Sequence, residues 1–175
     1  METATGEITL KPFRSGDCRQ ILDLYERAFP ADERRPIGEF CDLVATDTVS
    51  LRAIFVDNLF AGFITMWHFG KFSYIEHFAL DPEQRGRGIG SRVLGMLSGL
   101  LARPVVLEAE PPSLSPLAAR RIEFYHRNGF DIISTDYVQP PYGPGLNPVN
   151  LYLLATEPLN ADEVASELKK QVYKI

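Results

Sequence analysis

The 175-residue sequence predicts an α+β fold, in which helices flank a mixed, mostly antiparallel β-sheet in three layers. Three strand-like runs follow one another between residues 51 and 80 with only short breaks, which is typical of an antiparallel meander. The next runs alternate strand, helix, strand, helix and strand, and this order implies parallel pairing in the middle of the sheet. We expect one domain over residues 1–158 and a C-terminal helix over residues 159–175 that packs on it.

The first elements are a strand and two helices. "EITLKPF" alternates apolar and polar residues and predicts a strand. "DCRQILDLYERAF" predicts a helix, because Ile21, Leu24 and Tyr25 recur at helical spacing and Asp17 suits the N-cap position. A second, short helix is expected over about residues 37–46.

The meander comprises "LRAIFVD", "FAGFITMWHF" and "FSYIEHFAL". Asp57 and Asn58 favour a tight hairpin turn between the first two runs, and Gly70 with Lys71 favours another between the second and third.

The hydrophobic period then changes to that of a helix beginning near Ile89. "PVVLEAE" predicts a short strand, and Ser115 followed by Pro116 predicts the start of a further helix. That helix should run to Asn128, with Gly129 as a left-handed stop. "FDIISTDYV" and "PVNLYLLAT" predict the last two strands of the core.

The C-terminal tail predicts one more helix, since Asn160 and Glu163 have the spacing of a capping box. Val164, Leu168 and Val172 form one apolar stripe along it. We favour packing of this stripe on the chain's own core over its use as a partner surface.

Composition narrows the class of protein. Apolar residues make up 45% and charged residues 23% of the chain, and the net charge is −5, which argues against general nucleic-acid binding. No leader-like start and no apolar stretch of the roughly 20 residues that a membrane helix needs are present. Cys18 and Cys41 are expected to be reduced thiols, and the cysteines and histidines lack metal-ligand spacing. We therefore expect a cytoplasmic protein without a metal, a membrane or a nucleic-acid partner.

The stretch "DPEQRGRGIGS", residues 81–91, connects a strand to a helix and carries the strongest functional signal. The first amide groups of a helix have no intrahelical partner and carry partial positive charge. Glycines let such a backbone curl into a concave nest, and Arg85, Arg87 and Arg92 add formal charge. This combination predicts a phosphate or pyrophosphate site.

Several phosphate motifs compete for this loop. A Walker loop is ruled out because no lysine follows the glycines. The dinucleotide fingerprint is matched in part, as Glu108 lies about 20 residues further on, but antiparallel strands before the loop are foreign to that fold. The pattern Q/R-x-x-G-x-G/A is satisfied from Gln84 onward. The plain alternative is a glycine turn with solvated arginines.

"IEHFALDPEQRGRGIGSRVL" and "RRIEFYHRNGF" resemble, in order and about 40 residues apart, the two signature motifs of the GCN5-related N-acetyltransferase (GNAT) superfamily. The resemblance covers nearly the whole chain, from "ITLKPF" to "LYLLAT". It implies a sheet that is splayed between strands 4 and 5, where the pantetheine arm of acetyl-CoA enters and pairs with an exposed backbone. The pyrophosphate would lie on the loop amides. The implied coenzyme-binding residues are Phe78, Ala79, Leu80, Arg85, Gly86, Arg87, Gly88, Ile89, Gly90, Ser91 and Tyr125.

The resemblance also implies a catalytic role for Tyr125, because a tyrosine of the second motif commonly serves the departing thiolate in this family. The plain alternative is a core aromatic that packs beside Phe124 and Phe130. Both roles are compatible, since a tyrosine can bury its ring and present its hydroxyl.

The group that takes the proton of the amine is open between Glu76, Glu108 and an ordered water chain. Glu76 is preferred because an acid inside a largely apolar strand suggests a polar cleft on its face. Regular alternation places Glu76 and Tyr74 on one face of the strand and His77 on the other. Each glutamate has a structural alternative in a salt bridge.

One position departs from the family pattern. Ala118 stands where the family often carries an asparagine near the pantetheine, so Ser113 or Ser115 would have to supply that contact.

Acceptor specificity is expected from "FPADERRP" and from the loop 139–148. In the first stretch, Asp32 and Glu33 could attract a cationic amine, and Arg34 and Arg35 could hold a carboxylate. The loop suits either a semi-rigid lid over the cleft or a long hairpin connection.

The resulting prediction is an acetyl-CoA-dependent N-acetyltransferase. It would move the acetyl group directly, in a ternary complex, to a primary amine of a small molecule or a peptide. The alternative is a non-catalytic acyl-CoA-binding or regulatory domain of the same fold, and a nicotinamide-binding protein is a distant third. Dimers are common among such proteins, and the sequence leaves the oligomeric state open.

Overall fold

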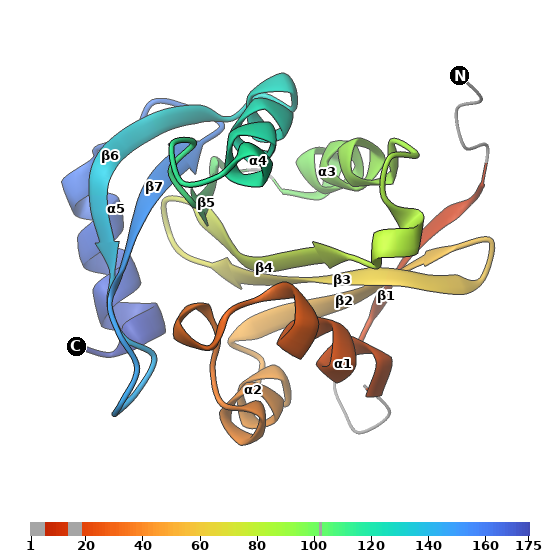
Figure 1. Cartoon of the computed structure of the whole chain (residues 1–175), viewed down its shortest axis with the longest axis horizontal. Coiled ribbons are helices and arrows are strands. Elements are labelled where there is room, and N and C mark those ends of the chain that lie inside the picture. Colours follow the sequence, from red (N-terminus) through yellow and green to blue (C-terminus); the bar gives the residue numbers. More distant parts are fainter. Residues whose placement is uncertain (1–5, 14–18, 102) are drawn as a thin grey trace. The chain divides into compact units, whose positions relative to one another are not determined.

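The computed structural model describes residues 6–13, 19–101 and 103–175 (Figure 1). Within it, the chain divides into two compact units: residues 1–30 with 36–103, and residues 31–35 with 104–175. Asp17, the expected N-cap, and Cys18 lie outside the described residues. In the described part, no helix is long and apolar enough to cross a bilayer. The prediction of one domain with an added C-terminal helix stays a prediction.

Four antiparallel strands form the sheet of the first unit: β1 (Ile8–Pro12), β2 (Val49–Val56), β3 (Leu59–His68) and β4 (Ser73–Leu80). The expected meander is therefore confirmed. Asp57 and Asn58 link β2 to β3 with φ angles of 49° and 67°, the positive values that a tight I′ hairpin turn requires.

Helices cover both faces of this sheet. Helices α1 (Arg19–Ala28) and α2 (Ile37–Val44) lie on one face, and α3 (Ile89–Leu100) lies on the other (Figure 1). Ile21 and Leu24 of α1 pack with Phe40 of α2 and with Phe63 of β3 in one buried cluster. The amphipathic spacing seen in the sequence thus gives α1 and α2 their apolar contact with the sheet.

A β-bulge interrupts β4 at Glu76. Thr65 of β3 lies opposite His77, whereas the next residue of β3 lies opposite Ile75, so Glu76 is an extra residue in the ladder. Trp67, two residues after Thr65, lies opposite Tyr74. Residues two apart share a face, so Tyr74 and His77 lie on the same side of the sheet. The expected alternation across this strand was wrong, because a bulge shifts the side-chain period by one residue.

The second unit has its own antiparallel strands, β5 (Val105–Ala109), β6 (Asp131–Gln139) and β7 (Val149–Ala155), in which β7 pairs with both others. The unit also contains the short helix η1 (Ala31–Glu33) and helix α4 (Pro116–Arg127). As expected, the Ser115 hydroxyl caps α4 by accepting from the Ala118 amide at 3.0 Å, and Gly129 ends it with a φ of 88°.

The chain ends in helix α5 (Ala161–Leu168), which continues as the π-helix η3 (Lys169–Tyr173). The Asn160 side chain accepts from the amides of Asp162 and Glu163, so the expected N-cap is confirmed. The change from α- to π-helix was not predicted by the sequence.

Candidate functional site

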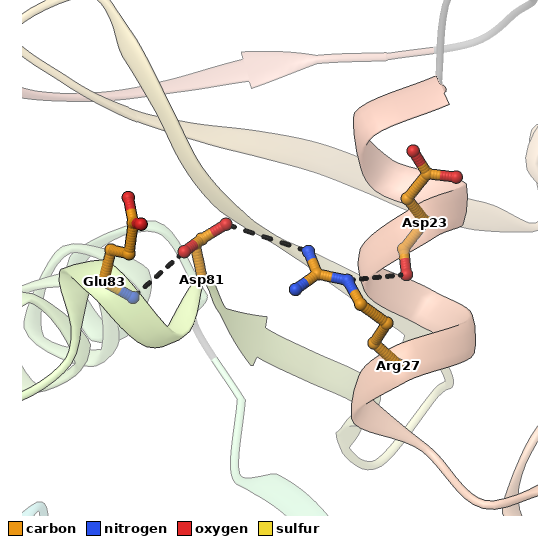
Figure 2. A network of polar contacts seen from close by, with 4 residues as sticks. All are labelled: Asp23, Arg27, Asp81 and Glu83. Carbon is orange, nitrogen blue, oxygen red and sulfur yellow. Dashed lines mark hydrogen bonds and ion pairs between the residues drawn. The ribbon is translucent and has the colours of Figure 1, made fainter.

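The glycine-rich loop begins with a fixed turn. Helix η2 (Pro82–Gln84) is capped by Asp81, whose carboxylate accepts from the Glu83 amide at 3.0 Å. The same carboxylate lies 3.8 Å from the guanidinium of Arg27 on α1, and Arg27 also donates to the Asp23 carbonyl at 3.3 Å (Figure 2). The start of the loop is thereby anchored to both β4 and α1.

Two glycines then give the loop its shape. Gly86 and Gly88 have φ angles of 75° and 72°, in the left-handed region that favours glycine. A Cβ added at either residue would meet no atom within 4 Å, so the space beside this backbone is open. The Arg92 amide donates to the Gly88 carbonyl at 3.2 Å, and the amides of Ile89 and Gly90 precede it in the first turn of α3. Two left-handed glycines directly before a helix start are features that anion-binding nests share.

The three arginines of the loop play different roles. Arg85 and Arg87 are exposed at its rim, and Arg87 donates to the Gln84 side chain at 2.6 Å. Arg92, by contrast, donates to the Gly6 carbonyl at 2.9 Å and so helps to hold the segment before β1. Two of the three expected cations are thus placed where they could face an incoming anion.

The side chains at the end of β4, the strand before the loop, alternate in burial. Ala79 is buried in the cluster under α1 and α2, whereas Phe78 and Leu80 are half-buried. Gly62 of β3, which pairs with β4, lies so close to it that an added Cβ would overlap the Ala79 carbonyl oxygen. Close packing of β3 therefore fixes the position of the β4 backbone at these residues.

Glu76 and His77 occupy different environments in spite of the bulge. The Trp67 indole donates to the Glu76 carboxylate at 2.8 Å, so the buried tryptophan holds this acid. His77 is buried, and its ring lies edge-on to Tyr25 and Phe29 of the first unit at centroid distances of 4.9 and 4.6 Å. We interpret His77 as a core residue.

Tyr125 lies in the second unit, on α4. Its ring contacts Phe124 at a centroid distance of 5.2 Å and Phe130 at 5.7 Å, the aromatic neighbours expected from the sequence. Burial raises the pKa of Tyr125 to about 12, although the nearby Arg121 guanidinium opposes the rise. Phe130 is buried, whereas Tyr125 as a whole residue is half-buried, so the pKa shift reflects the surroundings of its hydroxyl. The hydroxyl thus keeps its proton at neutral pH and can act as a proton donor.

Three glutamates of the second unit differ in their hydrogen-bond partners or in their pKa. Glu108 on β5 accepts from the Tyr173 hydroxyl at 2.8 Å, and Glu110 pairs with Arg121 of α4 at 3.1 Å. Burial raises the pKa of Glu33 from 4.5 to about 7; Glu110 and Asp32 add to the rise, and Arg121 opposes it. Glu110, the residue directly after β5, is thus engaged in a salt bridge.

The loop 139–148 is tied to η1 within the second unit. The Gln139 side chain donates to the Asp32 carbonyl at 3.0 Å, and the Asn147 amide donates to the Asp32 carboxylate at 2.8 Å. Arg35 is only 7% exposed; it donates to the Val172 carbonyl at 3.1 Å and lies over the Tyr142 ring. Asp32 and Arg35, two of the residues considered for acceptor binding, are therefore engaged in holding this unit together.

Sequence reasoning missed Tyr173 altogether and did not single out Glu33 as an acid with a shifted pKa. Tyr173 belongs to the tail that the sequence predicted as a packing helix, and no motif marks it. Glu33 was expected to attract a cationic amine because it lies in the charged stretch "ADERRP", but no sequence pattern indicates its raised pKa. Among the described residues, no group of three or more histidines, cysteines, aspartates and glutamates could hold a metal ion.

Comparisons with known proteins assign the class. A family model described as "Acetyltransferase (GNAT) domain" matches residues 43–132. A solved structure described as "Putative acetyltransferase from GNAT family from Bacteroides thetaiotaomicron" is 35% identical; the match covers 95% of this chain and 99% of that one with a TM-score of 0.87. The protein is thus an acyltransferase enzyme, and the chain belongs to the GNAT acetyltransferase family. A search of curated proteins found no match.

More distant structures share the fold. The structure of Arabidopsis thaliana Naa50 in complex with a bisubstrate analogue is 19% identical in sequence. The match covers 86% of this chain and 98% of that one, with a TM-score of 0.65. A GNAT acetyltransferase from Elizabethkingia anophelis with acetyl-CoA bound is 16% identical, with the same coverages and a TM-score of 0.60. The resemblance and the fold class predicted from the sequence are confirmed. The opening between strands 4 and 5 and the roles of individual residues stay predictions.

Proposed function

We propose that this enzyme transfers the acetyl group of acetyl-CoA to a primary amine of a small molecule or a peptide, directly within a ternary complex. The observation that carries the proposal is the loop between β4 and α3, with its two left-handed glycines, its open backbone and the helix start behind it. Relatives with acetyl-CoA or with a bisubstrate analogue bound support the same donor.

In this proposal the coenzyme uses the first unit. Its pyrophosphate accepts hydrogen bonds from the amides between Arg85 and Gly90, with Ser91 in the first turn of α3 and the arginines at the rim. Its pantetheine arm pairs with the β4 backbone from Phe78 to Leu80, as an added strand would. The Ser115 hydroxyl already caps α4, which favours Ser113 for the contact that an asparagine makes elsewhere in the family.

The chemistry divides between two proton transfers. The neutral amine attacks the thioester carbonyl, a C–N bond forms, and the C–S bond breaks as the tetrahedral intermediate collapses. Glu76, held by Trp67, takes the proton that the amine loses, either directly or through water. Tyr125, which is protonated at neutral pH, gives a proton to the departing thiolate and regains one from solvent. Glu108 and a water chain remain the alternatives to Glu76 as proton acceptor.

Two measurements test the proposal. Calorimetric titration with acetyl-CoA should show stoichiometric binding, and thiol release across a panel of primary amines should identify at least one acceptor. Coenzyme binding without turnover on any amine would favour the non-catalytic alternative. Binding of NAD without binding of acetyl-CoA would revive the dinucleotide-binding interpretation of the loop.

A further inference from the structure

Trp67 of β3 is hydrogen-bonded to the carboxylate of Glu76 on the neighbouring strand β4. The indole Nε1–H donates to Glu76 Oε1 at 2.8 Å, although the two residues lie nine positions apart in the chain. The strand pairing places Trp67 opposite Tyr74 and makes Glu76 an extra residue two positions further along β4. Bulges are over-represented next to active sites, where they re-aim a side chain. The bulge and the indole therefore both act on the direction of this carboxylate.

The indole is itself fixed by the turn of the hairpin between β3 and β4. Trp67 is buried, with 2% of its surface exposed. Its ring stacks on Phe69 at a centroid distance of 6.1 Å, and Phe69 packs edge-on against Phe72 at 5.2 Å. The Phe69 amide also donates to the Phe72 carbonyl at 3.0 Å. The donor that Glu76 meets therefore has a defined position.

Glu76 lies where this constraint bears on the reaction. It is half-buried, whereas its neighbours Ile75 and His77 on β4 are buried. It precedes by two residues Phe78, at which the proposed pantetheine contacts of the same strand begin. A glutamate side chain is flexible, and a fixed donor on one oxygen restricts its rotamers. The indole, the carboxylate and these backbone contacts all belong to the first unit.

We propose that Trp67 is a positioning residue for acyl transfer, whose indole N–H holds the Glu76 carboxylate in the orientation from which it takes the proton of the attacking amine. The inference rests on the proposed function and deepens it, because it names the group that makes Glu76 an effective proton acceptor. In this step the nitrogen of the tetrahedral intermediate loses one proton, the carboxylate gains it, and solvent receives it after the product has left. Trp67 keeps its indole proton throughout.

The test removes the hydrogen-bond donor and keeps the shape of the side chain. In the full-length protein, Trp67 is replaced by 3-benzothienylalanine, in which a sulfur atom takes the place of the indole N–H. Trp67 is the only tryptophan of the sequence, so loss of tryptophan fluorescence verifies the replacement. We expect kcat with the best amine of the panel to fall about tenfold, because a hydrogen bond to a charged group is lost. The KM of the amine and the calorimetric Kd of acetyl-CoA should change by less than about threefold.

A double-mutant cycle separates positioning from packing. In the Glu76→Gln background, where the side chain no longer takes a proton, loss of the indole donor should have no further effect on kcat. Phe63→Leu, which shortens another buried aromatic side chain of β3, is the matched control. It should lower the melting temperature and leave kcat within about threefold of wild type.

Each outcome decides between the inference and its alternatives. An unchanged kcat after loss of the donor, or an equal fall with and without Glu76, overturns the inference while the proposed transfer reaction stands. A Glu76→Gln variant with full kcat overturns it too, because the indole would then position no reacting group. A wild-type protein that acetylates no amine overturns both the inference and the proposed function.

Discussion

Replacing Glu33 with glutamine should alter how the stability of this protein depends on pH. Burial and the neighbouring carboxylates of Glu110 and Asp32 raise the pKa of Glu33 from 4.5 to about 7, against the opposing effect of Arg121. Between these two values the folded state binds more protons than the unfolded state. The contribution of Glu33 to the free energy of unfolding of the wild-type protein therefore falls as the pH rises from about 4.5 through about 7.

The size of the effect follows from the shift. At about 1.4 kcal/mol per pH unit, a rise from 4.5 to about 7 corresponds to about 3 kcal/mol between the two protonation states. Glu33 is only partly buried, and solvent screening reduces this to about 1–2 kcal/mol. Glutamine is neutral at every pH and so avoids the cost of the buried charge. Glu33→Gln should therefore be about 1–2 kcal/mol more stable than wild type at pH 8 and close to wild type at pH 5.

Urea unfolding at pH 5 and pH 8 measures both differences. Glu26→Gln, which removes an exposed carboxylate from α1 and changes the net charge equally, is the matched control. If Glu33→Gln gave the same stability change at both pH values, or lost stability at pH 8, then Glu33 would not be an acid with a raised pKa in the folded protein. In that case Glu33 would be ionised in the folded protein and would share Arg121 with Glu110 in a larger salt bridge.

The other predictions concern the coenzyme site and its chemistry. Gly62→Ala should destabilise the protein by about 1–3 kcal/mol in thermal unfolding, because the added Cβ would overlap the Ala79 carbonyl; an unchanged melting temperature would contradict this packing. Gly88→Ala should weaken acetyl-CoA binding in calorimetry, because alanine disfavours the φ of 72°. Gly95→Ala, a matched glycine in open space within α3, should leave binding intact, and equal losses in both variants would exclude the nest. Tyr125→Phe should keep the affinity for acetyl-CoA and lower turnover about 100-fold; full turnover would remove this tyrosine from the mechanism.

The sequence was sufficient for the fold because local signals and hydrophobic period agreed along the chain. The Asp57–Asn58 hairpin, the Ser115 cap and the Asn160 cap all formed where turn and capping chemistry placed them. The glycine loop likewise has the left-handed residues that its composition predicted. Each of these features depends on residues that are neighbours in sequence.

What the sequence could not give depends on pairing between distant segments. The bulge at Glu76 arises from the register of β4 against β3, and strand periodicity alone cannot show an extra residue. The contact of Tyr173 with Glu108 joins residues 65 positions apart through a π-helix, for which no sequence pattern was available. The pKa of Glu33 likewise depends on Glu110 and Arg121, which only the folded chain brings near.

Because α5 continues as a π-helix, the number of residues in this segment decides the position of Tyr173. Each residue of an α-helix turns the chain by about 100°. Deleting one residue between Lys169 and Val172 would allow an ordinary α-helical turn and would rotate Tyr173 away from β5. Homologues that are one residue shorter here would then present a different side chain to Glu108. Chain length in the tail thus decides which side chain meets Glu108.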